Sequence, residues 1–238
     1  MKKILLMAGC LLFLGFPASS HSFPIEEQRI TTDTEWRDLQ DNEVNRFKLH
    51  TNYFAYESVE KALSGDRKAS ENYLSLNGTW KFHYAETPDD RLSDFYLSNH
   101  DDSSWKSMPV PGLWELNGYG DPVYVNVGFA WRGHFKNNPP LVPIKDNHVG
   151  SYRRVINIPD NWMGRQVIAH FGSVTSNIYL YVNGKYVGYA EDSKVAAEFD
   201  ITPFLKKGRN LIAFQVFRWC DGSYCDCLLY TSPSPRDA

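Results

Sequence analysis

The alternation of apolar and polar positions is clearest in residues 177–191, NIYLYVNGKYVGYAE. Apolar side chains recur at every second position from Ile178 to Val182, which places them on one face of a β-strand. Asn183 and Gly184 tolerate the positive φ angles of a type I′ turn, and a second alternating run follows them. The segment therefore predicts a β-hairpin.

Other short segments also have the pattern of strands. Residues 211–219, LIAFQVFRW, are apolar on both faces, which suits a central strand. Residues 200–205, DITPFL, predict a helical turn capped by Asp200 or Thr202 and ended by Gly208. Three more strands are predicted in residues 74–85 (with an Asn77-Gly78 turn signal), 151–159 (ended by Pro159) and 165–172. Many short strands without βαβ alternation predict an all-β sandwich or jelly roll.

Residues 23–72 are polar and mixed, and they show no sustained helical or strand period. They predict an extended N-terminal arm that lies over the sandwich, with Trp36, Phe54 and Tyr56 as anchors. A short helix is possible within residues 61–73, KALSGDRKASENY.

Residues 1–22 have the features of a signal peptide. Lys2 and Lys3 precede the apolar run ILLMAGCLLFLGF, and small residues around Ala18 supply a cleavage site. The run is too short to span a membrane as a mature helix, so we expect a periplasmic or secreted protein with no membrane contact after signal removal. Cys10 leaves open a lipoprotein alternative.

Composition excludes few functions. The net charge of −3 implies no polyanion partner, so no nucleic acid is expected. Seven Trp and fourteen Tyr slightly favour a carbohydrate ligand, because these rings stack on sugar faces. The sequence holds no P-loop, dinucleotide fingerprint, HExxH or GxSxG. The nearest histidine pair, His134 and His148, is too small a set for zinc. Solvated roles are the default for the acidic residues Glu115, Asp121, Glu191 and Asp192.

Long segments rich in Gly, Pro and aromatic residues carry a family resemblance. They are MPVPGLWELNGYGDPVYVNVGFAW, NNPPLVPIKDNHVGSYRR, GSVTSNIYLYVNGKYVGYAEDSKVAAEFDIT and FQVFRWCDGSY, preceded by EWRDLQDNEVNRFKLHTNYFAY. Together they resemble the N-terminal region of glycoside hydrolase family 2 β-galactosidases, from Glu35 to Tyr224. The resemblance, closest to periplasmic enzymes of Bacteroides-like bacteria, implies a galactose-binding-like jelly roll at residues 73–225.

The resemblance also implies a parent enzyme, a retaining β-galactosidase that hydrolyses terminal β-D-galactosides such as lactose. In that family an immunoglobulin-like domain and a TIM barrel follow this region, and the barrel carries both catalytic glutamates. No catalytic residue is therefore expected in this chain, and the chain alone is expected to be inactive. Family members also use the arm in oligomer contacts, so a homo-oligomer is a possible assembly.

The resemblance implies two binding sites, one for the sugar and one for a cation. Asn126 matches the asparagine that hydrogen-bonds galactose in the barrel, where a buried amide discriminates between sugars. The resemblance implies a divalent cation, Mg²⁺ or Ca²⁺, held by oxygen ligands. The matching residues are Glu35, Asp38, Glu191 and Asp221, with the Asp41 carbonyl as a further ligand. The acidic stretch that supplies the family's sodium ligand is absent here, so no sodium site is expected.

Three cysteines lie near the end of the chain, in RWCDGSYCDC. A CxC spacing without a second ligand pair is a weak metal or redox signal. RWCDGSY matches the family, whereas Cys227–Asp237, CLLYTSPSPRD, resembles a translated transposase adapter from sequencing libraries. Residues 226–238 are therefore expected to be a non-native, disordered tail. Two alternatives to an enzyme fragment remain open, a free-standing carbohydrate-binding module and a structural assembly element.

Overall fold

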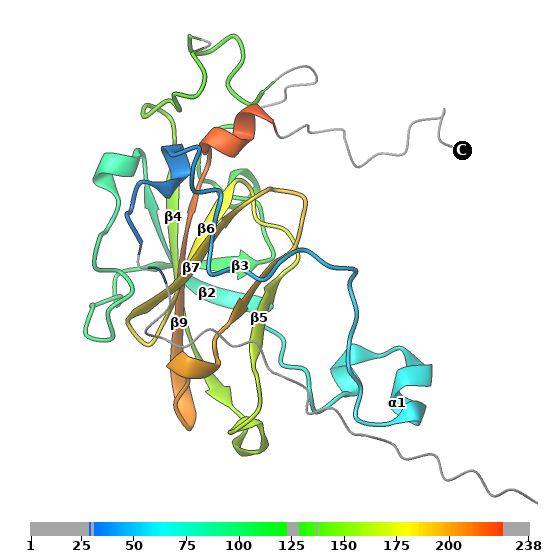
Figure 1. Ribbon diagram of the computed structural model, residues 1–238. Helices are drawn as coiled ribbons and strands as arrows, with labels where there is room; N and C mark the ends of the chain where they lie inside the picture. Colours follow the sequence, from blue (N-terminus) through cyan, green and yellow to red (C-terminus); the bar gives the residue numbers. More distant parts are fainter. Residues whose placement is uncertain (1–28, 30, 123–128, 137, 226–238) are drawn as a thin grey trace, which may run out of the picture.

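The computed structural model describes residues 29, 31–122, 129–136 and 138–225 (Figure 1). The predicted signal peptide, Asn126 and the predicted tail at residues 226–238 lie outside this set. Within it, no helix is both long enough and apolar enough to cross a membrane.

Most of the strands form one antiparallel sheet of seven, in the order β1-β7-β6-β9-β4-β2-β3. A second sheet pairs only β5 with β8. The strands are β1 (Glu43–Val44), β2 (Gly78–Ala85), β3 (Lys106–Val110), β4 (Val149–Ile158), β5 (Ile168–Phe171), β6 (Asn177–Val182), β7 (Lys185–Glu191), β8 (Ala197–Asp200) and β9 (Gly208–Phe217).

Two apolar clusters lie on opposite faces of the large sheet. One contains Trp80, Leu180 and Phe214 of the large sheet together with Ala169 of β5 and Phe199 of β8, so the small sheet covers this face. The other cluster is completed by the arm and by loops, through residues such as Trp36, Phe95 and Trp105. This layered antiparallel architecture confirms the all-β prediction and is consistent with a jelly roll.

The predicted hairpin is confirmed as β6 and β7. Asn183 and Gly184 join the strands with φ angles of 52° and 80°, as the turn requires. The predicted central strand is β9, which pairs with β6 on one side and β4 on the other. Because both of its faces are covered, all of its residues from Ile212 to Phe217 are buried.

The structure corrects two details of the strand predictions. The turn after β8 is a 3₁₀ helix at Thr202–Phe204, and the Asp200 carboxylate accepts from the Thr202 amide at 2.9 Å. Gly208 does not end this turn; it starts β9 with a φ of 76°. The first predicted strand begins at Gly78 rather than Leu74, so Asn77-Gly78 marks a strand start, not a turn between strands.

The arm is anchored mainly by Trp36 and by β1. Trp36 is buried and stacks on Phe217 at 5.3 Å between ring centroids. Strand β1 pairs with β7 at the edge of the large sheet. Phe54 and Tyr56 are half-buried and contact each other at 4.7 Å. Of the three predicted anchors, only Trp36 belongs to a core cluster.

A short helix does occur in the arm. Helix α1 spans Val59–Ser64, two residues before the predicted start, because the Ser58 hydroxyl caps it by accepting from the Lys61 amide at 3.3 Å. Gly65 ends it in the left-handed conformation, with a φ of 68°. Figure 1 shows α1 to one side of the sandwich.

Candidate functional site

Aromatic packing fixes the described parts of the long connection between β3 and β4, residues 111–148. Trp114 donates from Nε1 to the Tyr152 hydroxyl at 2.5 Å, and its ring lies where a Cβ on Gly150 would stand, 2.6 Å away. Trp131 is fully buried and packs against Trp219 at 5.4 Å. Trp114 and Trp131 lie on either side of residues 123–128, the segment that carries Asn126 and is outside the described residues.

Two of the four predicted metal ligands come together at one end of the large sheet. Glu191 ends β7, and Asp221 begins the 3₁₀ helix Asp221–Tyr224 after β9. Their carboxylate oxygens and the Cys220 sulfur all lie within 4.8 Å of one another. All three residues are buried, with 7%, 4% and 0% of their surface exposed.

The Glu191 carboxyl is held in place by its neighbours. It accepts from the Tyr189 hydroxyl at 2.5 Å and from the Gly222 amide at 3.1 Å. A Cβ on Gly222 would lie 2.5 Å from a Glu191 oxygen, so only glycine permits this approach. Burial, together with Asp221 beside it, raises the pKa of Glu191 to about 9. The carboxyl is therefore neutral at pH 7 unless a cation compensates the pair.

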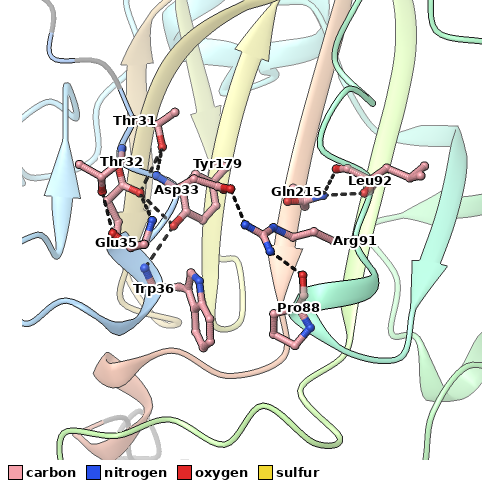
Figure 2. Close-up of polar contacts among 12 residues, drawn as sticks. Thr31, Thr32, Asp33, Glu35, Trp36, Pro88, Arg91, Leu92, Tyr179 and Gln215 are labelled. Carbon is pink, nitrogen blue, oxygen red and sulfur yellow. Dashed lines mark hydrogen bonds and ion pairs between the residues drawn. The ribbon is translucent and has the colours of Figure 1, made fainter.

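Neighbouring residues of the arm, together with Tyr179, donate hydrogen bonds to the Glu35 carboxylate (Figure 2). It is fully buried, and it accepts from the amides of Thr32 (2.7 Å) and Thr34 (3.1 Å). The hydroxyls of Thr31 and Tyr179 also donate to it, at 3.1 and 3.2 Å. Four donors satisfy this buried carboxylate without a metal, and they fix the arm where it enters the sandwich.

Asp38 and Asp41 also have partners within the arm. The half-buried Asp38 accepts from the Gln40 amide at 3.1 Å, and its carbonyl accepts from the Asp41 amide at 2.8 Å. The Asp41 carboxylate pairs with Arg29. In these contacts the four predicted ligands form two groups, one in the arm and one formed by Glu191 and Asp221.

The Glu191–Asp221 group fits a divalent cation in two respects. Within the described structure, the buried Asp221 Oδ1 has no hydrogen-bond partner, which is costly for a carboxylate oxygen. A cation between the pair would also remove the need for a proton on Glu191. Glu191 and Asp221 would hold the ion, and the ion would supply structural cross-linking between β7 and the end of β9. The sequence did not point to Cys220, whose thiol joins the group only in the folded chain.

We predict that Ca²⁺ or Mg²⁺ stabilises the folded chain through Asp221. At a free concentration one hundred times Kd, the gain is about 2.7 kcal/mol for one site that the unfolded chain lacks. Thermal unfolding with and without each ion measures it, and Asp221→Asn is expected to remove most of the shift. Asp89→Asn, on the exposed turn at Pro88–Asp90, is the control and should keep the shift. No shift with either ion would contradict the cation site.

Comparison with known proteins identifies the family. Residues 73–228 match the family model described as the sugar binding domain of glycosyl hydrolases family 2. The chain belongs to glycosyl hydrolase family 2. The matched region includes Glu191, Cys220 and Asp221, whereas Glu35 and Asp38 lie before it.

Several related proteins with curated names are β-galactosidases. One from Priestia megaterium is 42% identical over 184 residues, which cover 77% of this family 2 chain and 18% of the relative. One from Halalkalibacterium halodurans is 39% identical over 196 residues, covering 82% and 19%. A solved β-glycosidase from Bacteroides vulgatus aligns with 62% of this chain and 18% of its own, at 25% identity and a TM-score of 0.45. The chain thus spans under a fifth of the first two relatives.

Proposed function

We propose that this chain is the sugar-binding domain of a retaining β-galactosidase that hydrolyses terminal β-D-galactosides such as lactose. The observation that carries the proposal is the 42% identity with a β-galactosidase over 77% of the chain. The relatives are about five times longer than the matched region, which leaves room in such an enzyme for the immunoglobulin-like domain and TIM barrel expected from the family. In this proposal those domains are the principal partners of the chain, and galactosides are the substrate.

We further propose that the chain alone does not hydrolyse galactosides. A retaining glycosidase places two carboxyl groups on either side of the scissile bond, with a sugar between them. Glu191 and Asp221, two carboxyls that the fold brings within 4.8 Å of each other, are 7% and 4% exposed. A sugar ring cannot enter between them, so this pair supports a structural role instead of catalysis.

Asn126 is proposed to contact the substrate in the complete enzyme. Its support is the match of YVNVGF to the family segment that reaches the barrel. In the sequence this segment lies between Trp114 and Trp131, which both pack on the sandwich. We expect Asn126→Ala in the complete enzyme to lower kcat/KM for a nitrophenyl β-galactoside roughly 5- to 10-fold, since one neutral hydrogen bond contributes about 1 kcal/mol. Asn161→Ala, at an exposed position, is the matched control and should leave kcat/KM unchanged.

Export to the periplasm or beyond the cell is part of the proposal. Its support is the sequence pattern of residues 1–22, with two lysines before an apolar run and a small-residue cleavage site. Mass measurement of the protein recovered from a periplasmic fraction tests it. A mature chain that starts near residue 23 supports export, an acylated Cys10 supports the lipoprotein alternative, and an intact Met1 contradicts both.

A free-standing carbohydrate-binding module is the second candidate. One observation favours it: the described residues close a sandwich with an apolar cluster on each face of the large sheet. The gene downstream of Tyr224 separates the two candidates. A frame that continues into family 2 barrel motifs supports the enzyme, and a stop codon directly after the sandwich supports the module.

A further inference from the structure

A pocket of about 230 Å³ lies between the arm and the β5–β8 sheet. Its polar wall includes Glu198 of β8, His170 of β5 and His50 of the arm, and its apolar wall includes Phe47 and Leu49. Backbone contacts fix the arm here, since the Phe47 amide donates to the Glu198 carbonyl at 2.9 Å. The pocket is therefore a built feature of the fold, formed by three segments distant in sequence.

The carboxylate of Glu198 is oriented by two imidazoles. One oxygen accepts from His50 Nε2 at 2.6 Å, and the other accepts from His170 Nδ1 at 2.7 Å. Burial would raise the pKa of Glu198, but the bonds from His170 and His50 outweigh it and hold the pKa below its usual value. The carboxylate is thus ionised at neutral pH, and each oxygen keeps a lone pair for a further donor.

The surroundings restrict what this carboxylate can bind. An anion is disfavoured next to the Glu198 oxygens, because the carboxylate is itself negative. A cation is disfavoured because Lys48 and Lys194 line the same pocket as the two imidazoles. A purely apolar ligand would cover the remaining lone pairs of the Glu198 carboxylate without supplying donors to them. A neutral ligand with hydroxyl donors and an apolar face suits both walls.

Size and neighbouring side chains favour a single sugar ring. A pocket of about 230 Å³ is smaller than the 300–1,000 Å³ typical of drug-sized ligands. Tyr53 is not one of the lining residues, but its ring lies 5.3 Å from the ring of His50, which is, and it is 72% exposed. A sugar seated in the pocket could therefore stack on Tyr53 at the pocket edge. Asn52 also lines the pocket. Its side-chain oxygen accepts from Arg67 at 3.3 Å, so its NH₂ group points away from Arg67.

We propose that this pocket binds one neutral pyranose, with two adjacent hydroxyls on the Glu198 carboxylate and the apolar sugar face toward Tyr53 and Leu49. This subsite goes beyond the proposed function, because it needs neither Asn126 nor a catalytic barrel. It rests on the chain's own residues, so it can exist whether or not the parent enzyme is a β-galactosidase.

Titration of the labelled chain with methyl β-D-galactopyranoside, followed by amide NMR, tests the subsite. Shift changes are expected at residues 47–53 and 194–198, with a Kd of about 1 mM or weaker for so few contacts. Glu198→Gln should weaken binding about tenfold, because it removes the charge from the acceptor. Tyr53→Ala should also weaken binding, and it leaves the contacts of Glu198 with the arm intact.

The controls distinguish this site from others. Glu71→Gln, an exposed change elsewhere in the arm, should bind as the parent chain does. Sodium sulfate should not reproduce the shifts. The proposal is overturned if the sugar causes no shifts here, if sulfate causes the same shifts, or if both Glu198→Gln and Tyr53→Ala bind unchanged. None of these outcomes depends on hydrolysis, so they leave the proposed enzyme function to its own test.

Discussion

Replacing Gly188 with alanine should destabilise the fold by about 3 kcal/mol, at the upper end for overpacking of a filled core. Gly188 lies in β7, where the arm strand β1 and the small sheet both approach it. An added Cβ would stand 2.5 Å from the Val44 carbonyl oxygen and 2.7 Å from the Phe199 ring. Backbone on one side and a fully buried ring on the other leave little room for adjustment.

Denaturant unfolding measures this loss, and hydrogen exchange locates it. Exchange should rise first in the arm around Val44, because β1 pairs with the rest of the sheet only through β7. Gly172→Ala is the control, since its Cβ would meet only the His170 ring, at 3.8 Å. An unchanged unfolding midpoint for Gly188→Ala would show that β1 does not pack against β7 as described.

Replacing Glu191 with glutamine should remove a large pH dependence of stability, measured in EDTA. The pKa of Glu191 is raised from 4.5 to about 9 in the fold. The folded chain therefore binds a proton between these values that the unfolded chain does not bind. The stability that this proton contributes is fully present below the unfolded-state pKa of 4.5. Above it, the free energy of unfolding falls by about 1 kcal/mol for each pH unit until the folded-state pKa is reached. Glutamine resembles the protonated acid and does not titrate, so its curve should be flatter.

Urea unfolding at several values between about pH 5 and pH 8 provides the comparison. We expect Glu191→Gln to be more stable than the parent chain at the alkaline end, since the folded state no longer needs to take up a proton. Glu43→Gln, at an exposed position of β1, is the control and should keep the parental slope. Equal slopes for the parent chain and Glu191→Gln would contradict the burial of this carboxyl beside Asp221.

Local sequence pattern predicted the elements that depend on local chemistry. The β6–β7 hairpin follows from alternation and from Asn183-Gly184, and β9 follows from a run that is apolar on both faces. Strand β1 has only two residues and no period of its own. It exists because β7 offers an edge to pair with, and that partner is far away in the sequence.

The candidate site was only partly predictable for the same reason. The family resemblance pointed to Glu191 and Asp221, which the fold brings together. It could not show that Tyr179 and the threonines around Glu35 already satisfy that carboxylate. Nor does any local pattern link His50, His170 and Glu198, since three separate segments place them around one pocket. Contacts of this kind depend on tertiary packing, which single-sequence periodicity does not contain.

We propose that this chain supplies the sugar-binding domain of a β-galactosidase but none of its bond-breaking residues. Incubating the purified chain with 4-nitrophenyl β-D-galactoside tests the claim most directly, with the complete enzyme as positive control. We expect nitrophenol release by the complete enzyme and none above the buffer rate by the chain alone. Turnover by the chain alone that persists through purification would contradict it.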